Sequence, residues 1–503
     1  MPDKLAASAL LDMSRLTATT ALQQLQDGRL TTSALVDACQ QRIDQYNPML
    51  NALITLNREP ARQAASAMDT YRERGMRLPP LQGLPVSIKD SFCTRDLRTT
   101  ASFRPLQHYQ PTADATVVAR LRAAGAILMG KSNLPELAGA PHCWSPLFGL
   151  THNPWDLART PGGSSGGAAA AIAAGFSLLE IGSDLAGSIR IPAAYCGIAG
   201  LKASEGRIPR TGHIPHLPAH LGKTGRSVWH MLSMGVLARS VADLQLGYRL
   251  IAGPDGMDST VIPFTPAALT PDIAPPTGLS LALWDDFATP CSPAIEAGLH
   301  AVETRLRSAG LHVVRCAPAD FDLHTAWETF GLLAGSEVGL GLPGWQAKLG
   351  SWLRHVLPTR HAISHSLSRG LALDLHLYNQ ALNQREQLIS ALENFLDQWD
   401  AVLCPVAPVQ PYPGQAMPPH RPPPRVRVGS SMLPYLEATL SMTVPFSVTG
   451  NPVVVLPSGC IDSLPFGVQL IGKRWQDDAL LHVAAQLEKV LGGFVAPPWL
   501  SAS

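Results

Sequence analysis

The chain has 503 residues, of which 46% are hydrophobic and 15% are charged, and its 39 basic and 38 acidic residues leave a formal net charge of +1. This composition is typical of a compact protein with a large core and excludes a disordered chain. A nearly neutral chain has no overall field to attract a polyanion or an anionic membrane. We therefore expect neither nucleic acid nor a membrane as a partner.

The cysteines and the first residues bear on the cellular location. Eight cysteines are scattered along the chain, at Cys39, Cys93, Cys143, Cys196, Cys291, Cys316, Cys404 and Cys460. Their spacing excludes C-x-x-C metal sites and a tight disulfide framework, and it is typical of reduced thiols. Asp3 and Asp12 make residues 1–15 a poor signal peptide, and the weakly polar run 166–181 is too short to span a bilayer. We expect a cytoplasmic protein without a metal or a cofactor.

The first 75 residues are predicted to be helical and to pack on the outside of a core. One helix is expected from about residue 19 to Gly28, and a second from about residue 32 to Tyr46, because Pro48 should end it. The candidate N-caps of these helices are Thr19 or Thr20 and Thr32 or Ser33.

From residue 80 onward, strand-like and helical segments alternate. We expect strands at 84–88 and 126–129, and helices at 116–124 and 168–174. Such alternation predicts an α/β fold. The expected architecture is a single large domain over residues 1–503, with a central twisted, mostly mixed β-sheet covered by helices on both faces.

The rest of the chain divides into a core, an insertion and a return to the core. Residues 80–260 are the expected core, and 263–395 are expected to be a variable insertion that contributes to a substrate pocket. The insertion should contain a strand at 279–283 and a helix at 293–309. Residues 396–503 return to core-like sequence, with strands at 452–457 and 466–471 and a final helix from Asp477. The proline-rich residues 405–425 predict a long irregular loop.

Three short motifs match known templates but lack the context that the templates need. Gly125–Ser132 fits the P-loop pattern, yet its interval Ala-Ile-Leu-Met is itself predicted to be a strand. Gly162–Gly166 fits the nucleophile elbow of α/β-hydrolases, but a polar, prolyl segment precedes it where the elbow needs a strand, so this alternative is weak. Lys223–Gly225 resembles the third box of penicillin-recognising enzymes, whose S-x-x-K partner does not occur in the chain.

Two loops dense in serine and glycine, Gly162–Gly167 and Gly182–Pro192, lie on either side of an alanine-rich segment. The glycines around Ser164 exceed what a helix-capping serine needs, and glycines also allow a sharp turn next to Ser188. Upstream, Lys89 lies in an apolar, strand-like stretch where a charged amine is costly to bury. A buried lysine can lose its proton and act as a base near neutral pH.

Residues 80–205 resemble the amidase signature family, serine hydrolases of carboxylic amides, in residue type, order and spacing. Further matching blocks are Asp114–Val118, Gly130–Glu136, Asn153–Trp155, Ala238–Asp243, Pro445–Pro452 and Pro465–Gly472. Agreement in several separate blocks is more specific than any single motif. Residues 265–395 carry little resemblance.

The resemblance implies that Ser188 is the nucleophile, Ser164 the bridging serine and Lys89 the base. Neutral Lys89 would take a proton from Ser164 while Ser164 takes one from Ser188. The same relay would run backwards to protonate the leaving amine. A cis peptide bond is implied between Gly163 and Ser164.

The resemblance also implies the groups that support this chemistry. The developing oxyanion would be bound by the backbone N–H groups of Leu185, Ala186, Gly187 and Ser188. Ala186 stands where the family usually has glycine, and an alanine keeps the N–H. Asp184 and Arg190 are expected to form a buried ion pair beneath the loop, and Ser165 to hydrogen-bond within the same network.

The implied reaction is hydrolysis of a small-molecule carboxylic amide through a serine acyl-enzyme, by a monomer or a homodimer. If aromatic side chains of the unmatched segments wall the acyl pocket, an apolar, aryl or alkyl amide is favoured, with ester or carbamate side activity. The candidates are Trp229, Trp327, Phe330, Trp345 and Trp352.

Two other functions stay open. One is an acyltransferase or amidotransferase subunit of the same family, and the other is a non-catalytic scaffold. The tRNA amidotransferase subunit usually carries an Asp and then Gly-Pro ahead of the Ala-Arg-Ser-Val block, whereas this chain has Leu232–Leu237 there. That difference disfavours the tRNA amidotransferase role.

Overall fold

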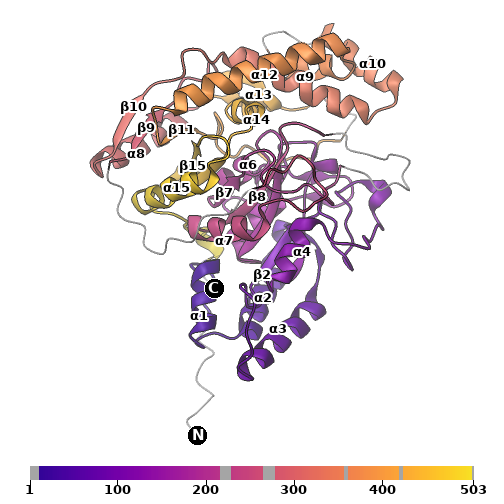
Figure 1. The fold of residues 1–503 in the computed structure, drawn as a ribbon, viewed down its shortest axis with the longest axis vertical. Coiled ribbons are helices and arrows are strands. Elements are labelled where there is room, and N and C mark those ends of the chain that lie inside the picture. Colours follow the sequence, from indigo (N-terminus) through magenta and orange to yellow (C-terminus); the bar gives the residue numbers. More distant parts are fainter. Residues whose placement is uncertain (1–10, 216–227, 264–277, 356–360, 419–422, 501–503) are drawn as a thin grey trace.

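A large mixed β-sheet runs through the molecule (Figure 1). The computed structural model describes residues 11–215, 228–263, 278–355, 361–418 and 423–500. Within these residues, eleven strands form the sheet in the order β1-β3-β2-β6-β8-β7-β14-β15-β11-β9-β10. The predicted α/β fold with a mixed sheet is confirmed.

The sheet combines parallel and antiparallel pairing. Its strands are β1 (Leu53–Leu56), β2 (Pro85–Lys89), β3 (Ile127–Ser132), β6 (Leu179–Asp184), β7 (Ala199–Lys202), β8 (Ser233–Ala238), β9 (Ser280–Leu283), β10 (His312–Arg315), β11 (Ala401–Pro405), β14 (Val453–Ile461) and β15 (Leu464–Ile471). Pairing is parallel between β2 and both β3 and β6, and between β9 and both β10 and β11; the other neighbours are antiparallel. Two short hairpins lie apart from the sheet: β4 (Trp144–Ser145) with β5 (Gly149–Leu150), and β12 (Arg425–Val428) with β13 (Ser431–Pro434).

Helices occupy much of the remaining described chain. The α-helices are α1 (Ala18–Gln26), α2 (Thr32–Leu50), α3 (Arg58–Glu73), α4 (Thr116–Ala123), α5 (Gly166–Ala174), α6 (Arg190–Cys196), α7 (Val241–Ile251), α8 (Pro293–Ser308), α9 (Leu323–Leu340), α10 (Gly344–Trp352), α11 (Ala362–Gly370), α12 (Leu375–Leu396), α13 (Tyr435–Leu440), α14 (Val444–Val448) and α15 (Asp477–Leu491). Short 3₁₀ turns are η1 (Arg104–Leu106), η2 (Glu136–Ala138), η4 (Leu353–His355) and η5 (Pro498–Leu500).

Two hydrophobic clusters cover the two faces of the sheet. Val454 and Leu456 of β14 pack in one cluster with residues of α2, α7, α8 and α15. Val453 and Val455 pack in the other with residues of α5, α6, α9 and α12. Because successive residues of a strand point to opposite faces, the two clusters lie on opposite sides of the sheet. Helices therefore cover both faces, as the alternating sequence pattern predicted.

The first 75 residues contain a strand that the sequence prediction missed. β1 has four residues between Asn51 and Asn57, too few for a visible alternation of apolar and polar side chains. It pairs antiparallel with β3 at the edge of the sheet. A short run of this kind cannot be distinguished from a helix end by periodicity alone.

The ends of the first two helices also differ from the prediction. α1 is capped by Thr17, whose side chain accepts from the amide of Thr20, rather than by Thr19 or Thr20. α2 continues past Pro48 to Leu50. Since Pro48 lies in the last turn of α2, it removes one hydrogen bond without breaking the helix.

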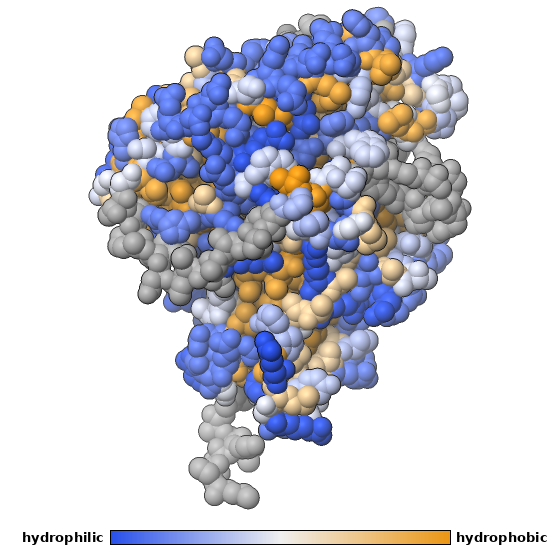
Figure 2. Space-filling model, in the orientation of Figure 1, coloured by the Kyte–Doolittle hydropathy of each residue, from blue (hydrophilic) through white to orange (hydrophobic). Residues whose placement is uncertain are grey.

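The insertion does more than decorate the sheet. Its strands β9 and β10 extend the sheet beyond β11, and α9, α10 and α12 lie at the end of the molecule opposite α1 and α3 (Figure 1). The predicted strand at 279–283 and helix at 293–309 are confirmed to within a residue. Leu349 and two tryptophans of α10 are exposed, and orange side chains are visible at that end of the molecule in Figure 2.

The structure also settles the rejected motifs. Residues 127–132 of the P-loop-like segment form β3, as predicted, and no strand precedes Gly162 in residues 151–161. Lys223–Gly225 lies outside the described residues. Residues 406–418 are irregular, as the proline content predicted. None of the described helices is both long and apolar enough to cross a bilayer.

Candidate active site

Three elements bring the predicted catalytic residues to one edge of the sheet. Lys89 is the last residue of β2, whose carboxyl end lies between those of the parallel strands β3 and β6. Ser164 lies just before α5, and Ser188 lies between β6 and α6. The carboxyl edge of parallel strands is where open α/β sheets bind ligands, because loops and helix N-termini converge there.

The Lys89 amine is buried, and its partners among the described residues are oxygen atoms. Its side chain is fully buried, and Nζ lies 2.7 Å from Ser164 Oγ, 3.1 Å from Ser183 Oγ and 3.3 Å from Ser183 O. Burial lowers the pKa of Lys89 to about 7, although the negative charge of Asp184 opposes the shift. At neutral pH, a large fraction of Lys89 is therefore an uncharged amine that can accept a proton.

The Ser164 and Ser188 loops are joined through the backbone. The Gly163–Ser164 peptide bond is cis, as the resemblance implied, and the Ser165 amide donates to Ser188 O at 3.0 Å. The Ser188 side chain is partly exposed and makes no hydrogen bond to the described residues, so its hydroxyl is not bonded to Ser164 in this structure. The first link of the predicted relay is formed, and the second is not.

Asp184 and Arg190 form the predicted buried ion pair. Both side chains are fully buried, with 2.8 Å between Arg190 Nη2 and Asp184 Oδ1. Arg190 also donates to Thr443 O at 2.7 Å and to Ser447 Oγ at 2.6 Å. The Arg190 charge and hydrogen bond hold the pKa of Asp184 well below its usual value despite burial. The pair fixes the start of α6 against the segment 443–447.

The predicted oxyanion hole needs one correction. The Gly187 amide donates to Asp184 Oδ1 at 2.7 Å, so it is not directed at a substrate. The amides of Leu185, Ala186 and Ser188 make no hydrogen bond to any described residue and stay available as donors. The Ala186 carbonyl accepts from Thr443 Oγ1 at 2.5 Å, which holds the loop from the opposite side.

Gly187 has a steric role that no other residue could fill. Its φ is +130°, and an added Cβ would lie 2.6 Å from Ile191 Cδ1 and 2.7 Å from Thr443 Oγ1. Both the backbone conformation and the lack of space therefore require glycine. The sharp turn predicted from the glycines next to Ser188 is confirmed.

The Ser165 side chain does not make the hydrogen bond that was predicted. Its Oγ is buried and has no partner among the described residues, and it faces Gly182, where an added Cβ would lie 3.1 Å away. Ser165 contributes to the network through its backbone amide instead. The sequence shows a hydroxyl at this position but not which atom of the residue faces the neighbouring loop.

Two residues next to Lys89 were not singled out from the sequence. Ser183 supplies two of the three oxygens around Nζ, and His213 Nε2 lies 3.0 Å from Ser183 Oγ. Ser183 lies within the glycine- and serine-rich motif and could have been found there. His213 gave no signal, because only a β-bridge between Phe92 and His213 brings it to this site.

A cavity of about 320 Å³ lies beside the segment that holds the Ala186 loop. Its lining includes Trp327, Ile363, Met432, Leu433 and Ser441, so the insertion and the β12–β13 hairpin both contribute. Trp327 Nε1 donates to Ser441 O at 2.9 Å. Of the aromatic residues predicted to wall a pocket, Trp327 lines this cavity, whereas Phe330 is buried in the core and the α10 tryptophans are exposed.

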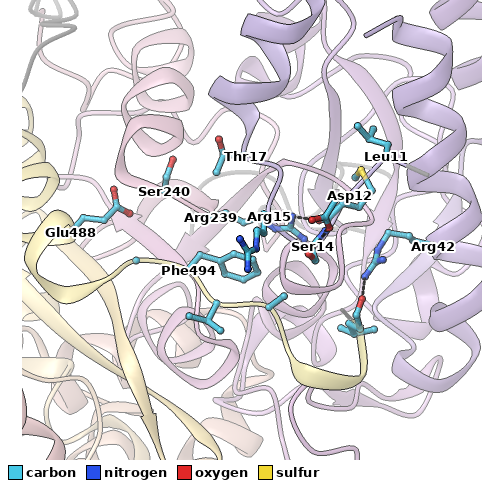
Figure 3. Close-up of a pocket in the computed structure, with 15 residues that line it drawn as sticks. Leu11, Asp12, Ser14, Arg15, Thr17, Arg42, Arg239, Ser240, Glu488 and Phe494 are labelled. Atoms are coloured by element: carbon cyan, nitrogen blue, oxygen red, sulfur yellow. Dashed lines mark hydrogen bonds between the residues drawn. The ribbon is translucent and has the colours of Figure 1, made fainter. Parts of the chain in front are cut away.

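A larger cavity of about 820 Å³ lies between the amino- and carboxyl-terminal segments (Figure 3). Arg42 Nε donates to Ala174 O at 2.6 Å, and Arg239 Nη1 donates to Leu16 O at 2.8 Å. The Arg239 guanidinium also lies 4.7 Å from the centre of the Phe494 ring. These arginines bind main-chain carbonyls and an aromatic face, so they hold the terminal segments together.

Known proteins resemble this chain along nearly its whole length. The amidase family model matches residues 34–481. A glutamyl-tRNA(Gln) amidotransferase subunit of Chloroflexus aggregans is 34% identical over 506 aligned residues, which cover 96% of this chain and 97% of the relative.

Solved structures give the same result. A structure from a vestigial protein complex, which reveals the evolutionary origins of an s-triazine catabolic enzyme, has a TM-score of 0.79 at 29% identity and covers 96% of this chain and 100% of its own. A crystal structure of an amidase has a TM-score of 0.76 at 28% identity, with coverage of 95% and 100%. Together with the sheet and the loops described above, these matches show that the chain belongs to the amidase family, the amidase signature enzymes.

Proposed function

We propose that this chain cleaves the C–N bond of a carboxylic amide through an acyl-enzyme on Ser188. One observation carries the proposal: the buried Lys89 amine lies 2.7 Å from the Ser164 hydroxyl, and the next residue's amide binds the Ser188 carbonyl oxygen. A base and a hydroxyl are thus in contact beside the predicted nucleophile. Membership of the amidase family supports the same class of reaction.

The first half-reaction forms the acyl-enzyme. With substrate bound, the Ser188 side chain rotates toward Ser164, which closes the relay that is open in the free protein. Neutral Lys89 takes the Ser164 proton, Ser164 takes the Ser188 proton, and Ser188 Oγ forms a bond to the carbonyl carbon. The free amides of the 185–188 loop bind the negative oxygen of the tetrahedral intermediate.

The second half of the cycle releases both products. The C–N bond breaks as protonated Lys89, acting through Ser164, returns a proton to the leaving nitrogen. Water then attacks the acyl carbon and gives up one proton to the relay. The relay returns this proton to Ser188 Oγ as the acyl bond breaks, and the products are an amine and a carboxylic acid.

The cavity next to the site favours an apolar, aryl or alkyl amide. Trp327, Ile363, Met432 and Leu433 offer it an apolar lining. Ser441 lines the same cavity and lies two residues before Thr443, which binds the Ala186 carbonyl. Pockets of this size bind small ligands mainly by apolar contact. An ester or carbamate with the same acyl group would acylate Ser188 by the same steps.

A second candidate function is that of an amidotransferase subunit. The relative from Chloroflexus aggregans carries that name at 34% identity over almost the full chain, so sequence similarity favours this candidate over a stand-alone amidase. In that case the amide nitrogen would be passed on with the help of partner chains rather than released to water. Against it stands Leu232–Leu237, which replaces the Asp and Gly-Pro expected there.

A labelling experiment tests the reaction, and a substrate screen separates the two candidates. A fluorophosphonate probe followed by peptide mapping should label Ser188 in the wild-type chain. A label on Ser164 or Ser165 would favour the α/β-hydrolase alternative, and no labelled serine would favour a scaffold. Product release from aryl and alkyl amides, esters, carbamates and glutamine should be fastest for an apolar amide. If only glutamine is cleaved, the amidotransferase role is the better account.

A further inference from the structure

The Lys89 amine is surrounded by three oxygen atoms, two of which belong to Ser183. An ammonium group has three N–H bonds and can donate to all three oxygens. A neutral amine has two N–H bonds and one lone pair. Once Lys89 is neutral, one of the three oxygens must therefore face the lone pair.

Which oxygen faces the lone pair decides whether Lys89 can act as a base. The Ser183 carbonyl oxygen carries no proton, so it can only accept from an N–H. Either hydroxyl could donate to the lone pair. If the Ser183 hydroxyl does so, Lys89 is blocked and cannot take the proton of Ser164. The relay therefore requires that the Ser183 proton points away from Lys89.

His213 lies where that proton can go. Its Nε2 is 3.0 Å from Ser183 Oγ, and the side chain is buried. The ring packs edge-to-face on Phe92, with 4.8 Å between the ring centres. The backbone of His213 is fixed as well, because its amide donates to Arg210 O at 3.0 Å and it forms a β-bridge with Phe92. The ring is thus held in place from both sides.

We propose that His213 is a positioning residue that sets the direction of the proton relay. As the tautomer protonated on Nδ1, it accepts the Ser183 proton at Nε2. The Ser183 oxygen then accepts from Lys89, and the Lys89 lone pair faces the Ser164 proton. In the tautomer protonated on Nε2, the ring would donate to Ser183 and turn the Ser183 proton onto the lone pair.

This inference rests on the proposed function, and it adds a residue that acts only through Ser183 and Lys89. No covalent bond changes at His213. Its effect is on the orientation of hydrogen bonds before the chemical step. The loss of such an orienting partner lowers kcat without a matching change in KM, because it does not touch the substrate.

The direct test compares two replacements of His213. His213→Leu removes the acceptor and should lower kcat between about 10- and 10⁴-fold, as the loss of the orienting partner of a catalytic base does, with KM unchanged. His213→Gln keeps an oxygen acceptor near the Nε2 position and should recover most of the rate. Wild-type kcat in the folded His213→Leu variant would overturn the proposal, and so would a raised KM with kcat unchanged.

A double-mutant cycle with Ser183→Ala makes the test independent of how well any one variant packs. Ser183→Ala removes one hydroxyl and should itself lower kcat. Because His213 acts only through that hydroxyl, adding His213→Leu to Ser183→Ala should cost less than about twofold more. Losses that multiply would contradict the proposal, as would wild-type kcat in Ser183→Ala. Thermal unfolding of each variant checks that the fold is retained.

The same experiments separate this inference from the proposed function. Wild-type chain without a fluorophosphonate label on Ser188 would refute the acyl-enzyme itself. A normal label on wild type, its loss in Lys89→Met and an unchanged labelling rate in His213→Leu would leave the acyl-enzyme intact and refute only the role of His213.

Discussion

The carboxyl ends of β2 and β3 each bury a lysine, and the two lysines have different partners. Lys89 and Lys131 lie on adjacent strands, where Ile88 pairs with Lys131, and both side chains are fully buried. Lys131 Nζ lies 3.6 Å from the Asp90 carboxylate and 2.6 Å from Phe92 O. Within the described part of the chain, Lys89 contacts no carboxylate and is bound by serine oxygens.

The difference shows that burial alone does not make a catalytic base. Burial lowers the pKa of both lysines, but the Asp90 charge opposes the shift at Lys131. A third buried lysine, Lys202, also has a pKa lowered to about 7, and its closest acceptor is Asn451 O at 2.6 Å. A carbonyl oxygen has no proton to give, so of these three lysines Lys89 combines a lowered pKa with a hydroxyl on the path to a nucleophile.

The largest expected effect is that of Lys89→Met on turnover. Without the base, kcat should fall by about 10²–10⁴-fold, the usual contribution of a general base. The fold should be retained, because methionine has a similar length and no charge to bury. Turnover of the best substrate and circular dichroism measure the two properties.

Lys202→Met is the matched control for that variant. It removes a buried lysine with the same lowered pKa but no hydroxyl partner among the described residues, and it should keep most of the turnover per folded molecule. A loss in Lys202→Met as large as in Lys89→Met would remove the distinction between the two lysines.

Lys131→Met should affect stability rather than chemistry. Removing one partner of a buried ion pair leaves the Asp90 carboxylate uncompensated, which typically costs about 3–5 kcal/mol. Urea unfolding monitored by fluorescence measures the change. If Lys131→Met unfolds at the wild-type urea concentration but loses turnover, Lys131 belongs to the chemistry and the comparison with Lys89 is wrong.

Asp184→Asn should weaken both the fold and the oxyanion loop. Asparagine keeps one oxygen acceptor but loses the charge that binds Arg190, so the free energy of unfolding should fall by about 1.5–3 kcal/mol. The turn at Gly187, held by the same carboxylate, should loosen, and kcat should fall at a temperature where the variant is folded. Unchanged kcat in the folded variant would show that the loop does not depend on Asp184.

Thr443→Val should have the smallest effect. It removes the hydrogen bond to the Ala186 carbonyl and keeps the shape of the side chain, at a cost of about 0.5–1.5 kcal/mol. A change in the acyl-group preference without a change in thermal stability would show that Thr443 touches the substrate pocket rather than only the loop.

The sequence predicted the parts of the site that are encoded locally. Lys89 was placed on a strand because its neighbours are apolar, and the glycine requirement at Gly187 followed from a serine next to a sharp turn. The engagement of the Gly187 amide by Asp184 could not be predicted, because it depends on how the loop closes on its own carboxylate. His213 could not be predicted either, since only the pairing with Phe92 places it beside Ser183.

The fold shows the same division between local and distant information. Strands and helices with several turns or apolar residues were predicted to within a few residues, as for α8 and β9. β1 was missed because four residues carry too little pattern, and its place is decided by pairing with β3. The helix end at Pro48 was set too early because a proline in the last turn costs only one hydrogen bond.

The central claim is that an uncharged Lys89 draws the proton from Ser164, and the pH dependence of Ser188 labelling tests it most directly. The neutral amine is the active form, so the rate of fluorophosphonate labelling should fall about tenfold per pH unit below a midpoint near the Lys89 pKa of about 7 and level off above it. Lys89→Met should abolish this dependence together with most of the rate. A wild-type rate that stays constant from about pH 5 to about pH 9 would contradict the account.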